Sequence, residues 1–328
     1  MQIADMHCDT IERLLRCQRQ GVDQGLREND GHVDLLRMKA GGYCLQNFAL
    51  FVNAGTCEDP WEEVCLLYRL YREEMERNSD LIAPALGVED IAANAASGKM
   101  SALLAVEEGA VCKGDLAKLR RLYEMGVRMM TLTWNYQNEL GSPSHYCTMG
   151  KKVRPDVPEG LTECGREFVT EMEELGMIVD VSHLSDAGFY DVLQTAQKPF
   201  VASHSNARAI CPAARNLSDD MIRKLAEKGG VMGLNFYADF LESVPAGKPN
   251  PGSLESIVNH ARHITDVGGM EVLGLGSDFD GIDTNEAIPH AGRMKDLWES
   301  LHRAGYTESQ LDRIFYGNVL RVYQETLG

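Results

Sequence analysis

The stretch ADMHCDT, residues 4–10, places a histidine and an aspartate on either side of a cysteine near the start of the chain. Side chains alternate along an extended strand, so His7 and Asp9 share one face while Cys8 points to the other. A neutral imidazole and a carboxylate are ligands that Zn²⁺ and similar borderline cations bind. The pair therefore predicts half of a metal site.

Residues of the same chemistry end apolar runs elsewhere in the chain: Glu107, His183, His204 and Asp278. One histidine alone would be better explained as a hydrogen-bonded residue of the core or rim. Imidazoles and carboxylates buried together without compensation are costly, however, and a metal ion supplies the missing positive charge. No cysteine belongs to the set, which argues against a structural zinc site built from thiolates. The combined pattern predicts a metal-dependent active site.

The elements that must position these residues are short apolar runs, each followed by a segment that can hold a helix. The runs span residues 2–7, 44–52, 101–107, 128–134, 177–183, 200–205, 230–236 and 271–279. Near-continuous apolar strands indicate burial on both faces, and hence parallel pairing with helices outside. Such units close a (β/α)8 TIM barrel, in which the carboxyl ends of the strands meet at one mouth. We expect this α/β fold, with residues 1–328 forming a single domain and the polar groups converging at the mouth.

Composition and charge limit the partners of the chain. Its 49 acidic and 32 basic residues give a formal net charge of −17, which repels phosphate backbones and anionic lipid surfaces. No apolar segment approaches the ~20 residues needed to cross a bilayer. The 9 cysteines are scattered with no C-x-x-C pair, and no signal peptide precedes the first run, which favours free thiols in a reducing compartment. We expect a cytoplasmic protein that binds neither nucleic acid nor membranes.

The remaining titratable residues are assigned no ligand role. Five histidines lie in polar or surface-like segments and are expected on solvated faces: His32, His260, His263, His290 and His302. Asp180 and Asp280 stand near the proposed ligands and are interpreted as structural. His145 lies in a long irregular segment, from which it could reach the site.

These residues make the chain resemble the renal (membrane) dipeptidase family, the M19 metallopeptidases among the amidohydrolase-like barrels, over almost its full length. His7 and Asp9 match the H-x-D motif of that family, and Glu107 matches its glutamate in LLAVEEG. The histidines of VDVSH and ASHSNAR, His183 and His204, match the other two positions. The resemblance implies two zinc ions, one held by His7 and Asp9 and the other by His183 and His204, with Glu107 bridging them.

The resemblance also implies how the substrate is held and cleaved. Arg215, in AARNLSD, would grip the terminal carboxylate, because a planar guanidinium holds a carboxylate through two parallel hydrogen bonds. Cations roughly 3.5 to 4 Å apart can hold a bridging water as hydroxide and stabilise the oxyanion that its attack creates. Asp278, in GSDFDG, would pass the proton of that water to the leaving amine. Glu107 and Asp278 are thus the predicted catalytic carboxylates.

One position departs from the family pattern. Animal members carry a histidine after the TLT of the fourth strand, which helps to polarise the substrate carbonyl, and this chain has Trp134 there, in MTLTWNYQN. An indole donates one hydrogen bond and cannot titrate. Trp134 is therefore expected to contact the substrate and to alter the stabilisation of the oxyanion and the substrate range, while His145 could substitute from its loop.

Three functional hypotheses remain open from the sequence. The first is a zinc-dependent dipeptidase that hydrolyses small unblocked dipeptides, including those with a D-residue at the carboxyl side. The second is a related barrel amidohydrolase acting on another amide, a lactone or an ester, although many such barrels use a carbamylated lysine where this chain has Glu107. The third is a non-catalytic barrel that binds a metal or a peptide. By resemblance, we expect a homodimer.

Overall fold

The computed structural model describes residues 1–144, 158–245 and 247–327. Its strands are β1 (Ile3–Cys8), β2 (Tyr43–Phe51), β3 (Ile82–Pro84), β4 (Met100–Glu107), β5 (Val127–Thr131), β6 (Ile178–Asp180), β7 (Val201–Ala202), β8 (Val231–Leu234) and β9 (Leu273–Leu275). Apart from β3, the strands are buried along almost their whole length. Such burial is typical of parallel strands that are covered on both faces.

All strands except β3 close into a barrel. They pair in parallel in the order β2-β1-β9-β8-β7-β6-β5-β4, and β4 pairs with β2, where Phe51 lies opposite Glu107. The predicted (β/α)8 TIM barrel is confirmed. Strand β3 is not among the predicted runs, and within the described residues it pairs only with the start of β4. It ends on Pro84, and a proline in a short apolar run argues against a strand.

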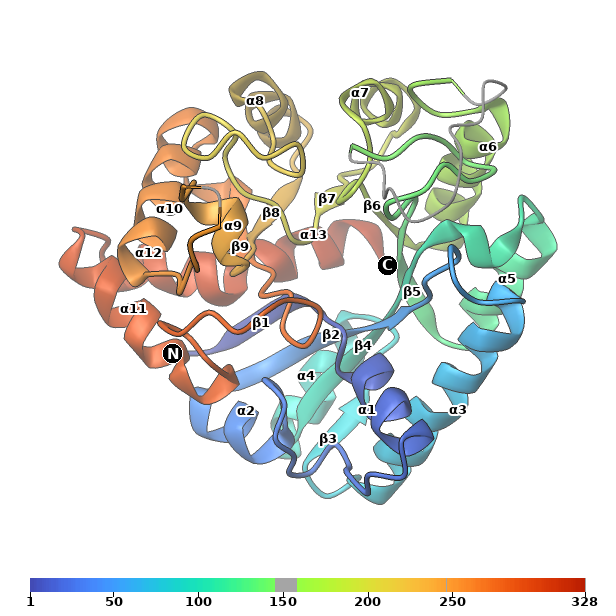
Figure 1. The fold of residues 1–328 in the computed structure, drawn as a ribbon, viewed down its shortest axis with the longest axis horizontal. Coiled ribbons are helices and arrows are strands. Elements are labelled where there is room, and N and C mark those ends of the chain that lie inside the picture. Colours follow the sequence, from blue (N-terminus) through green and yellow to red (C-terminus); the bar gives the residue numbers. More distant parts are fainter. Residues whose placement is uncertain (145–157, 246, 328) are drawn as a thin grey trace.

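Most of the helices surround the strands (Figure 1). They are α1 (Thr10–Arg19), α2 (Leu35–Gly41), α3 (Pro60–Arg77), α4 (Val88–Ala96), α5 (Leu116–Glu124), α6 (Glu163–Leu175), α7 (Asp186–Thr195), α8 (Asp219–Glu227), α9 (Ala238–Leu241), α10 (Leu254–Gly268), α11 (Met294–Arg303), α12 (Glu308–Asp312) and α13 (Asn318–Thr326). The Thr162 hydroxyl caps α6 by accepting from the Gly165 amide, and Gly176 ends that helix at φ 77°; both roles follow from ordinary capping chemistry. Within the described ranges, no helix combines the length and apolar character that a membrane span requires.

The apolar core has two parts, of which the larger lies between the barrel and the outer helices. The second fills the barrel, and it contains Met6, Leu45, Leu103, Met129, Ile178, Val201 and Val231 together with Val319, Val322 and Tyr323 of α13. Three of these, Ile178, Val201 and Val231, are the first residues of their strands. Helix α13 therefore covers the amino-terminal end of the barrel, and the carboxyl-terminal end remains for a site.

Candidate metal centre

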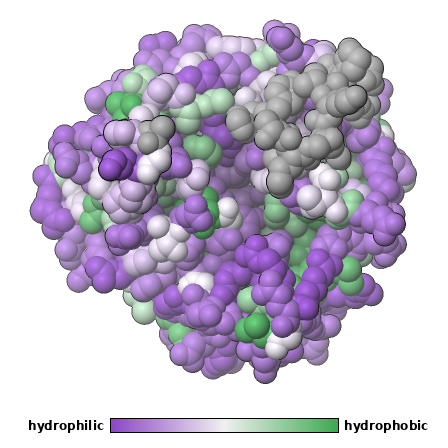
Figure 2. All heavy atoms as spheres, in the orientation of Figure 1, coloured by the Kyte–Doolittle hydropathy of each residue, from purple (hydrophilic) through white to green (hydrophobic). Residues whose placement is uncertain are grey.

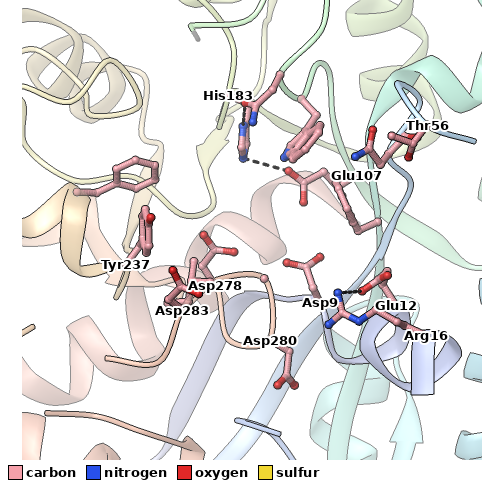
Figure 3. A pocket seen from close by; sticks show the side chains of 17 residues that line it. Asp9, Glu12, Arg16, Thr56, Glu107, His183, Tyr237, Asp278, Asp280 and Asp283 are labelled. Atoms are coloured by element: carbon pink, nitrogen blue, oxygen red, sulfur yellow. Dashed lines mark hydrogen bonds and ion pairs between the residues drawn. The ribbon is translucent and has the colours of Figure 1, made fainter. Parts of the chain in front are cut away.

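The strand ends bring together the ligands that the sequence predicts. His7 lies in β1, Asp9 follows that strand, and Glu107 is the last residue of β4. His183 and His204 follow β6 and β7. All five are buried, with at most 9% of any residue exposed. Figure 3 shows the carboxylates of Glu107 and Asp9 facing a common space, with His183 above Glu107.

Glu107 stands between two groups of possible ligands. Its Oε2 lies 3.1 Å from His7 Nε2, and its Oε1 lies 3.1 Å from His183 Nε2 and 4.0 Å from His204 Nε2. Asp9 Oδ2 lies 3.4 Å from His7 Nε2. Ligand atoms of His7, Asp9 and Glu107 lie within 4.8 Å of one another, as do those of Glu107, His183 and His204. One oxygen of Glu107 therefore faces the first ligand group, His7 and Asp9, and its other oxygen faces the second ligand group, His183 and His204.

The donor set fits a cation. Among the described residues, both ring nitrogens of His7, Asp9 Oδ1 and Glu107 Oε1 are buried without a hydrogen-bond partner. Buried polar atoms are normally satisfied, because leaving one unpaired costs about 1 to 3 kcal/mol. Nitrogen and oxygen donors that converge in this way suit Zn²⁺ or a similar divalent ion.

Electrostatics in the centre also favour added positive charge. Burial raises the pKa values of the Asp9 and Glu107 carboxyls. Burial opposes protonation of His7, but the Asp9 and Glu107 carboxylates outweigh it and raise the pKa of that imidazole well above its ordinary value. Burial, together with the neighbouring His7, Arg215 and His183, lowers the pKa of His204 well below its ordinary value. The lowered pKa favours the neutral form of His204, which is the form of an imidazole that binds metal ions.

Asp278 lies beside the first ligand group. Its Oδ1 is 3.9 Å from His7 Nε2, and its Oδ2 accepts a hydrogen bond of 2.8 Å from Asn235 Nδ2. Burial raises the pKa of Asp278 to about 7. Both Asp278 and His183 adopt left-handed backbone conformations, at φ 62° and 68°, which cost roughly 1 to 3 kcal/mol and concentrate at functional sites. These turns aim both side chains into the mouth directly after their strands.

Gly281 leaves room for the carboxylates of Asp9 and Asp278. A Cβ atom at this position would lie 2.0 Å from Asp9 Oδ2 and 2.7 Å from Asp278 Oδ1. Both contacts are far shorter than van der Waals separation. Glycine is therefore required here by the close approach of the two carboxylates.

Arg215 is buried next to the second ligand group, with 6% of the residue exposed. Its Nη2 donates to the His204 carbonyl at 3.0 Å and its Nη1 to Ser205 Oγ at 3.3 Å. Its Nε has no hydrogen-bond partner, and no ion pair joins Arg215 to a carboxylate in the part of the chain that the structure describes. A buried guanidinium without a paired anion is a candidate binding site for one.

A cavity of about 650 Å³ opens at the metal centre. Its lining includes Glu107, His183 and Asp278, together with the aromatic side chains of Trp134 and Phe240. The hollow is visible near the centre of Figure 2, on a face where hydrophilic residues predominate. The volume is in the range of small-molecule binding sites.

Trp134 is half-buried on the wall of this cavity. Its ring packs edge-on against Phe51, with centroids 4.9 Å apart, and lies 6.2 Å from the His183 ring. Its backbone amide donates to Glu108 Oε2 at 2.9 Å. The indole therefore presents an apolar surface beside the second ligand group.

The prediction for His260 is wrong. His260, expected on a solvated face, is fully buried: its Nδ1 accepts from the Ala207 amide at 3.0 Å and its Nε2 lies 2.9 Å from the Leu241 carbonyl. A satisfied imidazole can be buried in a helix whose sequence is otherwise polar. His145 lies outside the described residues.

Two residues in contact with the ligating imidazoles are not among those predicted from the sequence. Asn135 Oδ1 lies 3.0 Å from His183 Nδ1, and Ser203 Oγ lies 2.7 Å from His204 Nδ1. Ser203 precedes a predicted ligand in the chain, but neither residue type carries a chemistry that marks it alone.

Comparisons with known proteins agree with this geometry. Residues 1–327 match the family model for membrane dipeptidase, peptidase family M19. An uncharacterized dipeptidase of Schizosaccharomyces pombe is 32% identical over 99% of this chain and 80% of that protein. The crystal structure of a Rhodobacter sphaeroides metallopeptidase, liganded with a phosphinate mimic of the dipeptide L-Ala-D-Ala, matches with a TM-score of 0.87 and 28% identity over 99% of both chains. The M19 metallopeptidase dipeptidase AC matches with a TM-score of 0.88 and 27% identity over 100% of this chain and 99% of that one. The chain therefore belongs to the membrane dipeptidase family, peptidase family M19, and is a metal-dependent dipeptidase.

Proposed function

We propose that the chain hydrolyses small unblocked dipeptides with two zinc ions held at the mouth of the barrel. His7 and Asp9 would bind one ion, His183 and His204 the other, and Glu107 would bridge them. The observation that carries this proposal is the position of Glu107, whose two oxygens each lie 3.1 Å from an imidazole nitrogen of a different ligand group.

The chemistry divides between the ions and the protein. When bound, the ions would supply the positive charge that activates water for attack and polarises an amide carbonyl. Asp278 would take the proton of the attacking water and deliver it to the leaving amine, a role that requires a carboxylate beside both. Its hydrogen bond from Asn235 holds one oxygen and leaves the other directed at the ligand group of His7.

Arg215 would select substrates that end in a free carboxylate. Its buried guanidinium has no paired carboxylate among the described residues, and a bidentate contact with the end of a dipeptide would supply one. Phe240, which lines the cavity, lies against this guanidinium, with 5.6 Å between Cζ and the ring centroid. The dipeptide mimic bound by the related R. sphaeroides metallopeptidase supports the inclusion of substrates with a D-residue at the carboxyl side.

Trp134 would contact the substrate as an apolar wall and would not polarise its carbonyl. Its indole is held between Phe51 and His183 and offers at most one N–H donor. Stabilisation of the developing oxyanion would then depend on the metal ions more than in members with a histidine at this position.

The test combines metal quantification with a substrate panel. We expect two zinc equivalents per chain and hydrolysis of L-Ala-L-Ala and L-Ala-D-Ala, with little turnover of the corresponding dipeptide amides. Equal turnover of the amides would remove Arg215 from its role. Hydrolysis of lactones or N-acyl amino acids without dipeptide cleavage would indicate a related amidohydrolase, and zinc binding without any turnover would indicate a non-catalytic barrel.

The compartment and the assembly are also proposals. The cysteines that the structure describes are free thiols, which supports the expected cytoplasmic location. A homodimer is expected from family resemblance. Light scattering of the purified chain would give its mass directly, and a monomer at micromolar concentration would contradict the expectation.

A further inference from the structure

Asp180, the last residue of β6, is fully buried and lies outside both ligand groups. Its Oδ1 accepts from the backbone amides of Ser182 and Ser203, each at 2.9 Å. Its Oδ2 accepts from Thr131 Oγ1 at 2.7 Å and from Ser203 Oγ at 2.6 Å. Four donors therefore converge on one carboxylate, which joins the carboxyl ends of β5, β6 and β7 beneath the centre.

The single proton of the Ser203 hydroxyl is committed to Asp180, since a carboxylate that receives these donors acts as an acceptor. The Ser203 oxygen can then only accept from its other neighbours. One of these is His204 Nδ1, at 2.7 Å. The Nδ1 atom of His204 must carry the ring proton, so its Nε2 atom presents a lone pair to the metal centre.

The neighbouring imidazole, His183, also has an acceptor beside its Nδ1 atom. His183 Nδ1 lies 3.0 Å from Asn135 Oδ1, an amide oxygen that can only accept. His183 Nε2 therefore also carries a lone pair, and it lies 3.1 Å from His204 Nε2. Neither atom can donate to the other, and two facing lone pairs at this distance call for a cation beside them.

We infer that the Asp180–Ser203 pair is a positioning device that sets the tautomer of His204 and holds its Nε2 atom ready for one of the two metal ions. This inference rests on the proposed function, in which His204 is a metal ligand. Partners that orient a ligating imidazole typically change metal affinity by about 10- to 100-fold when they are removed.

Within residues 1–144, 158–245 and 247–327, the other ligand group has no equivalent pair. Asp5, the buried carboxylate behind His7, accepts from the backbone amides of His7 and Ser277, at 3.2 and 2.9 Å. The Nδ1 atom of His7 has no hydrogen-bond partner among the described residues. The Asp180–Ser203 pair therefore acts on one ion only, and its loss should distinguish the two metal sites.

The experiment measures zinc retained per chain after equilibration with a graded series of chelator concentrations. For Ser203→Ala we expect one zinc equivalent to bind about 10- to 100-fold more weakly, while the other binds as in the parent chain. Asp180→Asn should act in the same direction, because the amide no longer commits the serine proton. Thr131→Val is the matched control: it removes a different donor to Asp180 without touching His204, and it should change neither affinity by more than about threefold.

Several outcomes would overturn the inference. They are unchanged retention of both ions in Ser203→Ala, equal weakening of both ions, or an equal effect in Thr131→Val. A parent chain that bound no zinc would instead refute the proposed function and remove the basis of the inference. Thermal melting of each variant without metal checks that the fold persists.

A spectroscopic readout on the unaltered full chain makes the result independent of the folding of the variants. Long-range ¹H–¹⁵N correlation spectra of the zinc-loaded protein should show the His204 ring proton on Nδ1. A proton on Nε2 would overturn the inference whatever the variants do.

Discussion

The sharpest prediction concerns Arg215 and the free carboxylate of the substrate. Arg215→Met keeps an unbranched stem and removes the guanidinium with its charge. The parent chain and the variant are each assayed with a dipeptide and with its amide. If Arg215 binds the terminal carboxylate, the substitution should reduce kcat/KM strongly for the free dipeptide and little for the amide. The comparison of four kcat/KM values isolates this one contact.

The expected size of the effect follows from the burial of Arg215, of which 6% is exposed. Hydrogen bonds to charged groups contribute about 1.5 to 3 kcal/mol each, and two unit charges 4 Å apart interact by about 4 kcal/mol at an effective dielectric constant of 20. We therefore expect a coupling energy of about 3 to 4 kcal/mol. At about 1.4 kcal/mol per factor of ten, this corresponds to a change of roughly 100- to 1,000-fold.

Arg16 supplies a matched control. It lines the cavity at the metal centre, but its side chain is 54% exposed and lies 3.5 Å from Glu12. Exposed ion pairs contribute about 0 to 1 kcal/mol, so Arg16→Met should change the ratio of the two substrates less than about fivefold. A coupling below about 0.7 kcal/mol for Arg215→Met, or equal coupling for Arg16→Met, would refute the assignment.

Three further predictions address the metal centre and the fold. Glu107→Gln should weaken the binding of both ions and reduce kcat by at least about 100-fold, because a neutral amide cannot bridge two cations; zinc quantification checks this, and selective loss of one ion would contradict the bridging role. Gly281→Ala should displace the carboxylates of Asp9 and Asp278, which a Cβ would approach to 2.0 and 2.7 Å, and should lower zinc affinity without loss of fold; unchanged affinity would show that the turn gives way. His260 should make the protein less stable in acid, because burial lowers its pKa from 6.5 to about 4, so that below pH 6.5 the unfolded chain gains a proton that the folded chain does not. At 1.36 kcal/mol per pH unit, the loss of unfolding free energy amounts to roughly 3 kcal/mol by pH 4. The unfolding free energy of His260→Gln, measured beside that of the parent at each pH, should not show this loss. Parallel curves for the two proteins would rule out the role of His260.

Much of the fold and of the candidate site could be predicted from the sequence. The apolar runs are long enough to mark the barrel strands, and a glycine such as Gly176 marks a helix end through its left-handed conformation. The H-x-D spacing of His7 and Asp9 puts both side chains on one strand face. Because the carboxyl ends of the strands meet at one end of a (β/α)8 barrel, Glu107 and His183 are expected at the same mouth. The helix end and the H-x-D spacing depend only on residues that are close in the chain. The meeting of Glu107 and His183 depends only on the barrel fold, in which active sites lie at the carboxyl ends of the strands.

The sequence could not indicate which polar residues are buried by neighbours distant in the chain. His260 lies on a helix that is polar enough to suggest a solvated face, yet both its ring nitrogens find backbone partners from other elements. The commitment of the Ser203 proton to Asp180 likewise depends on two strands that meet only in the closed sheet.

Local periodicity and side-chain chemistry thus predicted the barrel and the ligands, and the motifs around those ligands carried the resemblance to the family. The tertiary structure alone decided the left-handed turns at His183 and Asp278, the absence of a carboxylate partner for Arg215 among the described residues, and the contact of His204 Nδ1 with Ser203 Oγ. The physical reason is that a hydrogen-bond partner, unlike a strand or a helix, is specified by distance in space. Closure of the barrel sets those distances between residues far apart in the chain.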